Sequence, residues 1–114
     1  MLASGTMQDC ALGKWDRHVT SFMKDVFWNS LKTRLTTLET SSGLEFNYYA
    51  ASLTVQNKKR TRIVKISNSG EVQVDVKRST GGFKSQSFSL TTVGDTVECF
   101  AQQVQKQFPA LAVI

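Results

Sequence analysis

Proline, histidine and cysteine are scarce in this chain. Its 114 residues include one proline, one histidine and two cysteines. The cysteines, Cys10 and Cys99, lie near opposite ends of the sequence and do not form the dense pattern of a small disulfide-stabilised protein. We therefore expect reduced thiols in a cytosolic or nuclear protein. A bridge between the N-terminal segment and the end of the chain is the open alternative.

Long apolar runs are also missing. No run approaches the roughly 20 residues that a helix needs to cross a bilayer. The segment from Met1 to Leu12 is small and polar, and it lacks the basic-then-apolar layout of a signal peptide. We expect a cytoplasmic protein, with a peripheral membrane or nuclear location as the alternatives.

Signatures of catalysis and of metal binding do not occur either. His18 is the single histidine, and its neighbours suggest no catalytic partner. One histidine and two cysteines do not complete a tetrahedral zinc site. The chain has no phosphate-binding glycine loop, no GxSxG motif and no recognisable pair of acid–base carboxylates. We expect a protein that is not an enzyme and that uses no cofactor or metal.

Composition predicts one folded domain. The chain is 40% hydrophobic and 20% charged, which is ordinary for a globular protein of this length. Residues 1–13 are predicted to be a flexible N-terminal tail, and residues 14–114 a single α+β domain.

Hydrophobic periodicity predicts two helices. Between Asp16 and Glu39 the apolar residues recur at helical spacing. They are Val19, Phe22, Met23, Val26, Phe27, Leu31, Leu35 and Leu38. A capping box of Thr92 and Asp95 opens a second helix, which ends at Pro109. Its apolar stripe is Val93, Val97, Phe100, Ala101, Val104 and Phe108.

Between the helices the pattern alternates as in β-strands. Residues 44–55 predict one strand with a bulge near Ala50 and Ala51, and residues 60–67, 71–78 and 83–90 predict three more. Phe88 and Leu90 are the expected core residues of the last strand. The prediction is an α+β fold of helix, four-stranded antiparallel meander and helix. Both helices should pack on one sheet face, because both apolar stripes need a surface to cover.

Positive charge is concentrated in one stretch. The formal net charge is +5, and residues 58–84 hold eight basic and two acidic residues. In an antiparallel hairpin the start of one strand lies beside the end of the next, so the basic residues should meet at one end of the sheet. The predicted anion-binding residues are Lys58, Lys59, Arg60, Arg62, Lys77, Arg78 and Lys84. Protection of sheet edges by lysine is the alternative interpretation.

Tyr48 and Tyr49 are neighbours on a predicted strand, so one of them should face away from the core. An exposed tyrosine beside a basic strand can stack on a nucleic-acid base. Packing against neighbouring side chains is the alternative role.

Two segments resemble a known family. They are Val74-Asp75-Val76-Lys77-Arg78-Ser79-Thr80-Gly81 and Gly94-Asp95-Thr96-Val97-Glu98-Cys99-Phe100, followed by an amphipathic helix. These sequences resemble the end of kinase-associated regulatory domains, which lie at the C-termini of some Ser/Thr kinases. The resemblance implies two helices on one face of a four-stranded sheet. It also implies binding of acidic phospholipids through a basic patch, or inhibition of a kinase domain.

These observations predict a non-catalytic regulatory or binding domain that engages an anionic partner through a basic sheet end. Acidic phospholipids at a membrane surface are the first hypothesis. One alternative is an RNA-binding module, similar in outline to the small Alu-RNA-binding subunits of the signal recognition particle. Another is a protein–protein interaction domain. We expect no small-molecule substrate.

Overall fold

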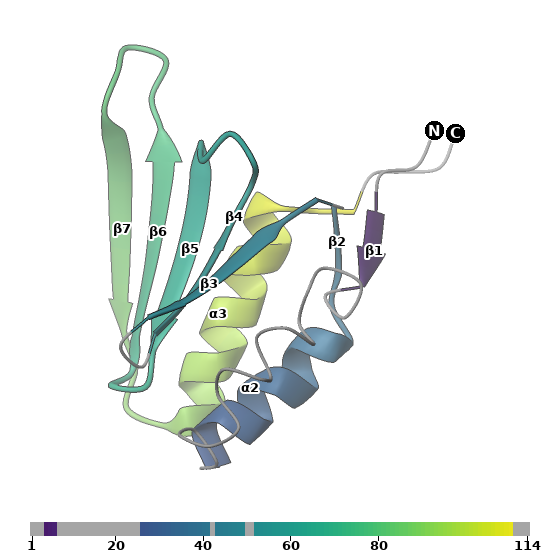
Figure 1. Ribbon diagram of the computed structural model, residues 1–114. Coiled ribbons are helices and arrows are strands. Elements are labelled where there is room, and N and C mark those ends of the chain that lie inside the picture. Colours follow the sequence, from purple (N-terminus) through teal and green to yellow (C-terminus); the bar gives the residue numbers. More distant parts are fainter. Residues whose placement is uncertain (1–3, 7–25, 42, 50–51, 111–114) are drawn as a thin grey trace.

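A five-stranded antiparallel sheet with two helices on one side forms the body of the protein (Figure 1). The computed structural model describes residues 4–6, 26–41, 43–49 and 52–110. The sheet strands lie in the order β3 (Glu45–Tyr49), β4 (Ser52–Gln56), β5 (Arg62–Ser67), β6 (Glu71–Lys77) and β7 (Phe83–Ser89). The helices are α2 (Val26–Thr36) and α3 (Val93–Gln107). A separate small sheet pairs β1 (Ser4–Thr6) with β2 (Glu39–Ser41). The predicted α+β class is confirmed.

The prediction of four strands was wrong, because residues 44–55 form a hairpin instead of one strand. β3 and β4 pair antiparallel, with Phe46 opposite Val55. Both residues contribute to the core, yet one has an even number and the other an odd number. Side chains alternate between sheet faces along a strand, so an uninterrupted strand would send these two to opposite faces. A chain reversal between them places both on the same face. The predicted bulge at Ala50 and Ala51 lies outside the described residues.

The apolar residues of the sheet form continuous rows across the strands. Leu53, Ile66 and Val72 occupy one row, and all three are fully buried. In the next row Val64 pairs with both Val55 and Val74. We call the face that carries these rows the helix-side face and the other the open face. The predicted alternation of β5 and β6 is confirmed.

Both helices lie on the helix side of the sheet, with α3 next to the strands (Figure 1). α3 packs on β5 and β6, and α2 packs against α3 (Figure 1). The predicted stripes supply the buried residues Phe27, Leu31, Leu35 and Leu38 of the α2 segment and Val97, Phe100, Ala101, Val104 and Phe108 of the α3 segment. Val93 is the exception, with 39% of its surface exposed. Val93 is the first residue of α3, and at this end of the helix the apolar stripe is not fully buried. Val19, Phe22 and Met23 lie outside the described residues.

Helix α2 ends at Thr36, short of the predicted end at Glu39, because threonine hydroxyls bind back to the last turn. Thr36 Oγ1 donates to the Thr33 carbonyl and Thr37 Oγ1 to the Arg34 carbonyl, each at 2.8 Å. Such bonds offer the backbone an alternative to the helix. Glu39, the last residue of the predicted helix, instead begins β2. Its partner β1 lies within the predicted tail, and Thr40 of β2 also bridges to Pro109 after α3.

Helix α3 begins as the capping box predicts. Thr92 has extended backbone angles, and its side chain accepts a hydrogen bond from the Asp95 N–H at 3.1 Å. An exposed ion pair then joins this helix to α2. Arg34 Nε lies 2.9 Å from Glu98 Oε2, and Arg34 Nη2 lies 3.2 Å from Glu98 Oε1. This two-pronged hydrogen bonding lowers the pKa of Glu98 and raises the pKa of Arg34.

We expect Glu98→Gln to lower the free energy of unfolding by no more than about 1 kcal/mol at neutral pH, because the pair is solvent-exposed. The lowered pKa means that the folded state favours the charged carboxylate. The stabilisation should therefore be present above the ordinary pKa of glutamate and disappear as the pH falls through the lower folded value. Urea titrations of both proteins across this pH range provide the measurement. A difference that grows on acidification would contradict the assignment.

Gly70 in the β5–β6 turn lies close to the backbone of Leu90. Its φ is +97°, and a Cβ there would collide with the carbonyl oxygen of Leu90. Gly70→Ala should therefore cost about 2 to 4 kcal/mol of unfolding free energy through strain and collision together. Gly81→Ala is the matched control, because Gly81 also has positive φ but open space at its Cβ position. Gly81→Ala should lower the free energy of unfolding by only about 1 kcal/mol. Thermal denaturation of both variants measures the difference. Equal costs would show that the collision is absent.

Candidate anion-binding site

Strand register brings two turns to the same end of the sheet. Arg62 on β5 pairs with Val76 on β6, which pairs with Lys84 on β7. The β4–β5 turn, residues 57–61, and the β6–β7 turn, residues 78–82, therefore lie at the same end (Figure 1). We call the cations gathered there the basic cluster: Lys58, Lys59, Arg60, Arg62, Lys77, Arg78 and Lys84. The expected meeting of the two groups is thus found in the register.

The β4–β5 turn is organised by one asparagine side chain. Asn57 Oδ1 accepts hydrogen bonds from the backbone N–H groups of Thr61 at 2.9 Å and Arg62 at 3.2 Å. Asn57 Nδ2 donates to Thr61 Oγ1 at 2.7 Å. Arg60 closes the turn with a φ of 55°, an uncommon conformation for a residue other than glycine. The turn presents the exposed residues Lys58, Lys59 and Arg60.

The β6–β7 turn uses glycine instead. Gly81 and Gly82 have φ values of +102° and +73°. The Arg78 N–H donates to the Gly82 carbonyl at 2.9 Å and closes the hairpin. This hairpin projects beyond the β4–β5 turn (Figure 1). It carries Lys77, Arg78 and Lys84 to the outermost end of the sheet.

The cations of the basic cluster are exposed and largely free of protein partners. Arg62 is the exception, because its Nη1 donates to the Gln107 carbonyl at the C-terminus of α3, at 3.2 Å. A cation is favoured at the negative end of a helix dipole, so Arg62 also has a structural role. Within the described part of the chain, the other six form no side-chain hydrogen bond or ion pair.

Two carboxylates of the open face, Glu45 and Asp75, form no salt bridge with the cluster in the described part of the chain. Glu45 accepts a hydrogen bond from Gln56 Nε2 at 3.1 Å. Asp75 accepts from Ser85 Oγ at 2.6 Å and from Gln73 Nε2 at 3.1 Å. Both carboxylates are thus engaged by uncharged donors. The cations of the turns, Lys58, Lys59, Arg60 and Arg78, are exposed to solvent.

The basic cluster wraps around the sheet end and is not confined to one face. Arg62 and Lys84 share the helix-side row of Val76, whereas Lys77 pairs with Phe83 in a row of the open face. Phosphate groups spread over a surface match such an array better than a single small molecule held in a pocket.

Sequence reasoning overlooked two residues at this end. Phe83 is 46% exposed, and Lys106 is exposed in the last turn of α3. The exposure of Phe83 could have been predicted, because side chains alternate along a strand and Phe83 lies five positions before Phe88, which packs against the core. The expected core positions Phe88 and Leu90 are half-buried and contact the core. Lys106 lies at this end because the C-terminus of α3 lies there. No signal in the sequence indicates that the end of this helix is near the two turns.

The tyrosines proposed for base stacking are separated from the basic cluster. Tyr48 and Tyr49 end β3, whereas Glu45 at its start pairs with Gln56 beside the β4–β5 turn. At about 3.3 Å per residue, Tyr49 lies roughly 13 Å along the strand from that end. The two tyrosine side chains lie outside the described residues.

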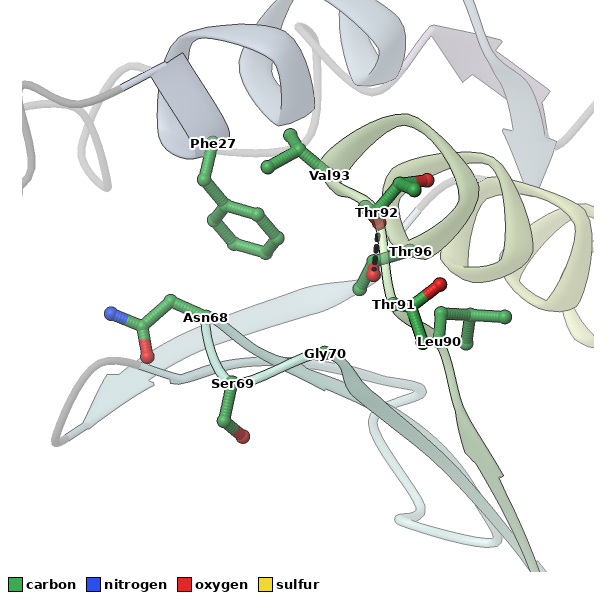
Figure 2. A pocket seen from close by; sticks show the side chains of 9 residues that line it. All are labelled: Phe27, Asn68, Ser69, Gly70, Leu90, Thr91, Thr92, Val93 and Thr96. Atoms are coloured by element: carbon green, nitrogen blue, oxygen red, sulfur yellow. Dashed lines mark hydrogen bonds between the residues drawn. The ribbon is translucent and has the colours of Figure 1, made fainter.

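A small cavity of about 90 Å³ lies at the other end of the sheet. Figure 2 shows Phe27 of α2, the β5–β6 turn and the start of α3 around it. The Thr92 and Thr96 hydroxyls at its wall are occupied, because Thr92 Oγ1 caps α3 and Thr96 Oγ1 donates to the Thr92 carbonyl at 2.7 Å. Both threonine side chains thus serve the first turn of α3.

Other candidate chemistry is limited. The described residues contain no cluster of three or more His, Cys, Asp and Glu side chains suited to a metal. Cys99 is a free, half-buried thiol, and burial raises its pKa. Cys10 and His18 lie outside the described residues.

No helix in the described ranges has the length and apolar character needed to span a bilayer. Comparison with protein-family models, curated proteins and solved structures gave no match.

Asn57→Ala should disorganise the β4–β5 turn. It removes the acceptor for two backbone N–H groups and should cost about 1 to 2 kcal/mol of unfolding free energy. Asn57→Asp is the matched control, because it keeps the acceptor oxygen; it loses the donation to Thr61 and adds a negative charge beside the cations of the turn. Chemical denaturation should show a clearly smaller loss for the aspartate variant. Equal losses would contradict the role of Oδ1.

Proposed function

We propose that this protein is a non-catalytic binding domain that attaches to acidic phospholipid surfaces through its basic cluster. The observation that carries the proposal is the shared position of the two turns, which gathers seven exposed cations at one sheet end. Each basic residue near an anionic membrane contributes about 1 kcal/mol, so several acting together give useful attachment. The attraction should weaken as salt is added, because exposed charges are screened.

The shape of the cluster supports a membrane surface as the partner. Four of its cations lie on the two turns, and the other three, Arg62, Lys77 and Lys84, lie at the adjoining strand ends on both faces of the sheet. A single-stranded RNA site would combine cations with stacking platforms. Here the candidate tyrosines end β3 on the side away from these turns. Phe83 is an exposed aromatic side chain at this end, so our preference for lipid headgroups over RNA rests on the array of cations that wraps around the sheet end.

The resemblance to kinase-associated regulatory domains supports the same proposal from a different direction. That family combines two helices with a four-stranded sheet, where this chain has five strands, and several of its members bind acidic phospholipids through basic patches. A regulatory or scaffolding role at a membrane surface is the function that we infer from the resemblance together with the basic cluster. A kinase domain held inhibited by this domain belongs to the same proposal.

Charge reversal in the β4–β5 turn tests the proposal. Lys59→Glu with Arg60→Glu should weaken binding to phosphatidylserine-containing vesicles by at least about 30-fold, since two attractions of about 1 kcal/mol each are lost. Vesicle co-sedimentation across a salt series measures the change, with circular dichroism to verify folding. Unchanged binding by the folded variant would contradict the proposal.

Single variants provide a matched control for charge. Lys59→Glu and Lys65→Glu reverse the same charge, but Lys65 lies in the interior of β5 and pairs with Gln73 on the open face. Lys59→Glu should therefore weaken binding more than Lys65→Glu. Equal effects would indicate attraction by net charge alone. Preference for a structured RNA over the vesicles would replace the lipid proposal with nucleic-acid binding.

A further inference from the structure

β7 forms a free edge of the five-stranded sheet. It pairs with β6 on one side, and no described strand pairs with its other side (Figure 1). An edge of this kind carries a row of unpaired backbone donors and acceptors.

The register identifies the outward-facing backbone groups. The Arg78 N–H donates to the Gly82 carbonyl, and the Leu90 N–H donates to the Gly70 carbonyl. In an antiparallel ladder, hydrogen-bonded pairs alternate with non-hydrogen-bonded pairs. The β7 residues that bond to β6 are therefore the even-numbered ones. The backbone N–H and C=O groups that face away from β6 belong to Phe83, Ser85, Ser87 and Ser89.

Lys84 is the single feature of this edge that usually protects against strand pairing. Natural edge strands are shortened, bulged or supplied with proline and several charges. β7 instead has seven residues in unbroken register with β6. It contains no proline, and Lys84 is its single charged residue. The small serines leave the outward backbone groups accessible to another strand.

The side chains of the edge suggest the chemistry of the added strand. Lys84, Gln86 and Phe88 lie on the helix-side face of β7. α3 packs on β5 and β6, and Gln86 at the centre of β7 is exposed. An added strand would therefore place alternate side chains beside half-buried Phe88 and exposed Lys84. An apolar residue would extend the core at Phe88, and an acidic residue would pair with Lys84.

We propose that the β7 edge binds an extended acidic peptide as an additional antiparallel strand. The peptide carries an apolar residue opposite Phe88 and, four positions later, an acidic residue opposite Lys84. Lys77 and Arg78 make this end positive, whereas Glu71 pairs with Ser89 at the other end, so the acidic residue belongs beside Lys84. Backbone pairing supplies affinity and the alternate side chains supply specificity. The peptide shares Lys84 with the basic cluster, whereas its backbone pairing with Phe83, Ser85, Ser87 and Ser89 does not depend on membrane attachment.

A second copy of β7 matches the edge less well. The strand contains no acidic residue, so an antiparallel pair of β7 strands offers no partner for Lys84. An acidic peptide satisfies both the backbone groups and this charge. We therefore commit to the peptide as the occupant.

Fluorescence anisotropy with a short labelled peptide tests the proposal. The probe is rich in threonine and valine and carries isoleucine and, four positions later, glutamate. Ser87→Pro removes an outward N–H while leaving the ladder to β6, and proline is tolerated on edge strands. The affinity of the Ser87→Pro variant for the peptide should be at least about tenfold lower than that of the wild type. Ser87→Ala is the matched control and should bind as the wild type does. Equal binding by the proline and alanine variants would overturn the proposal.

A change in the peptide tests the same point without altering the protein. N-methylation of the peptide residues that face β7 removes their donors and should abolish binding. This arm stays decisive if Ser87→Pro does not fold. Replacement of the peptide glutamate by lysine should weaken binding, and Lys84→Glu should restore it. Undiminished binding of the N-methylated peptide, or no binding of the original peptide, would contradict the proposal.

Sedimentation analysis tests the competing occupant. The wild-type protein should stay monomeric at the concentrations used for peptide binding. A dimer that Ser87→Pro dissociates would show that β7 pairs with a second copy, and it would overturn the assignment of an acidic peptide.

Discussion

The pairing of apolar rows across β4, β5 and β6 is the constraint on which the rest of the structure depends. Leu53, Ile66 and Val72 pair across these strands on the face that the helices cover. A slip of one residue would turn a whole strand's apolar side chains to the opposite face, so burial fixes the register. The register in turn fixes which turns meet and which backbone groups face outward on β7. The basic cluster and the free edge are consequences of how the core is buried.

The sequence predicted most of the elements because their signals are local. Alternation marks β5 and β6, and Thr92 with Asp95 marks the start of α3. The β3–β4 reversal was missed, although the parity change between Phe46 and Val55 indicates it. The end of α2 depends on threonine hydroxyls that bind the preceding carbonyls, and helical periodicity does not reveal this competition.

The candidate site was predictable to a similar extent. Antiparallel pairing alone predicts that the cations near Lys59 and Lys77 meet at one end, and the register agrees. Three features depend on long-range packing. They are the contact of Arg62 with the Gln107 carbonyl, the position of Lys106 and the separation of Tyr49 from the cluster. These features follow from how strands and helices pack, which single-sequence periodicity does not determine.

Chemical-shift mapping with anionic bicelles tests the central claim most directly, because it locates contact residue by residue. We expect shifts confined to residues 57–62 and 76–84, reduced by added salt and absent with neutral bicelles. This result would identify the shared end of the two turns as the membrane-binding surface. Shifts centred instead on the β5–β6 turn and the start of α3, or no shifts with anionic lipid, would contradict the account.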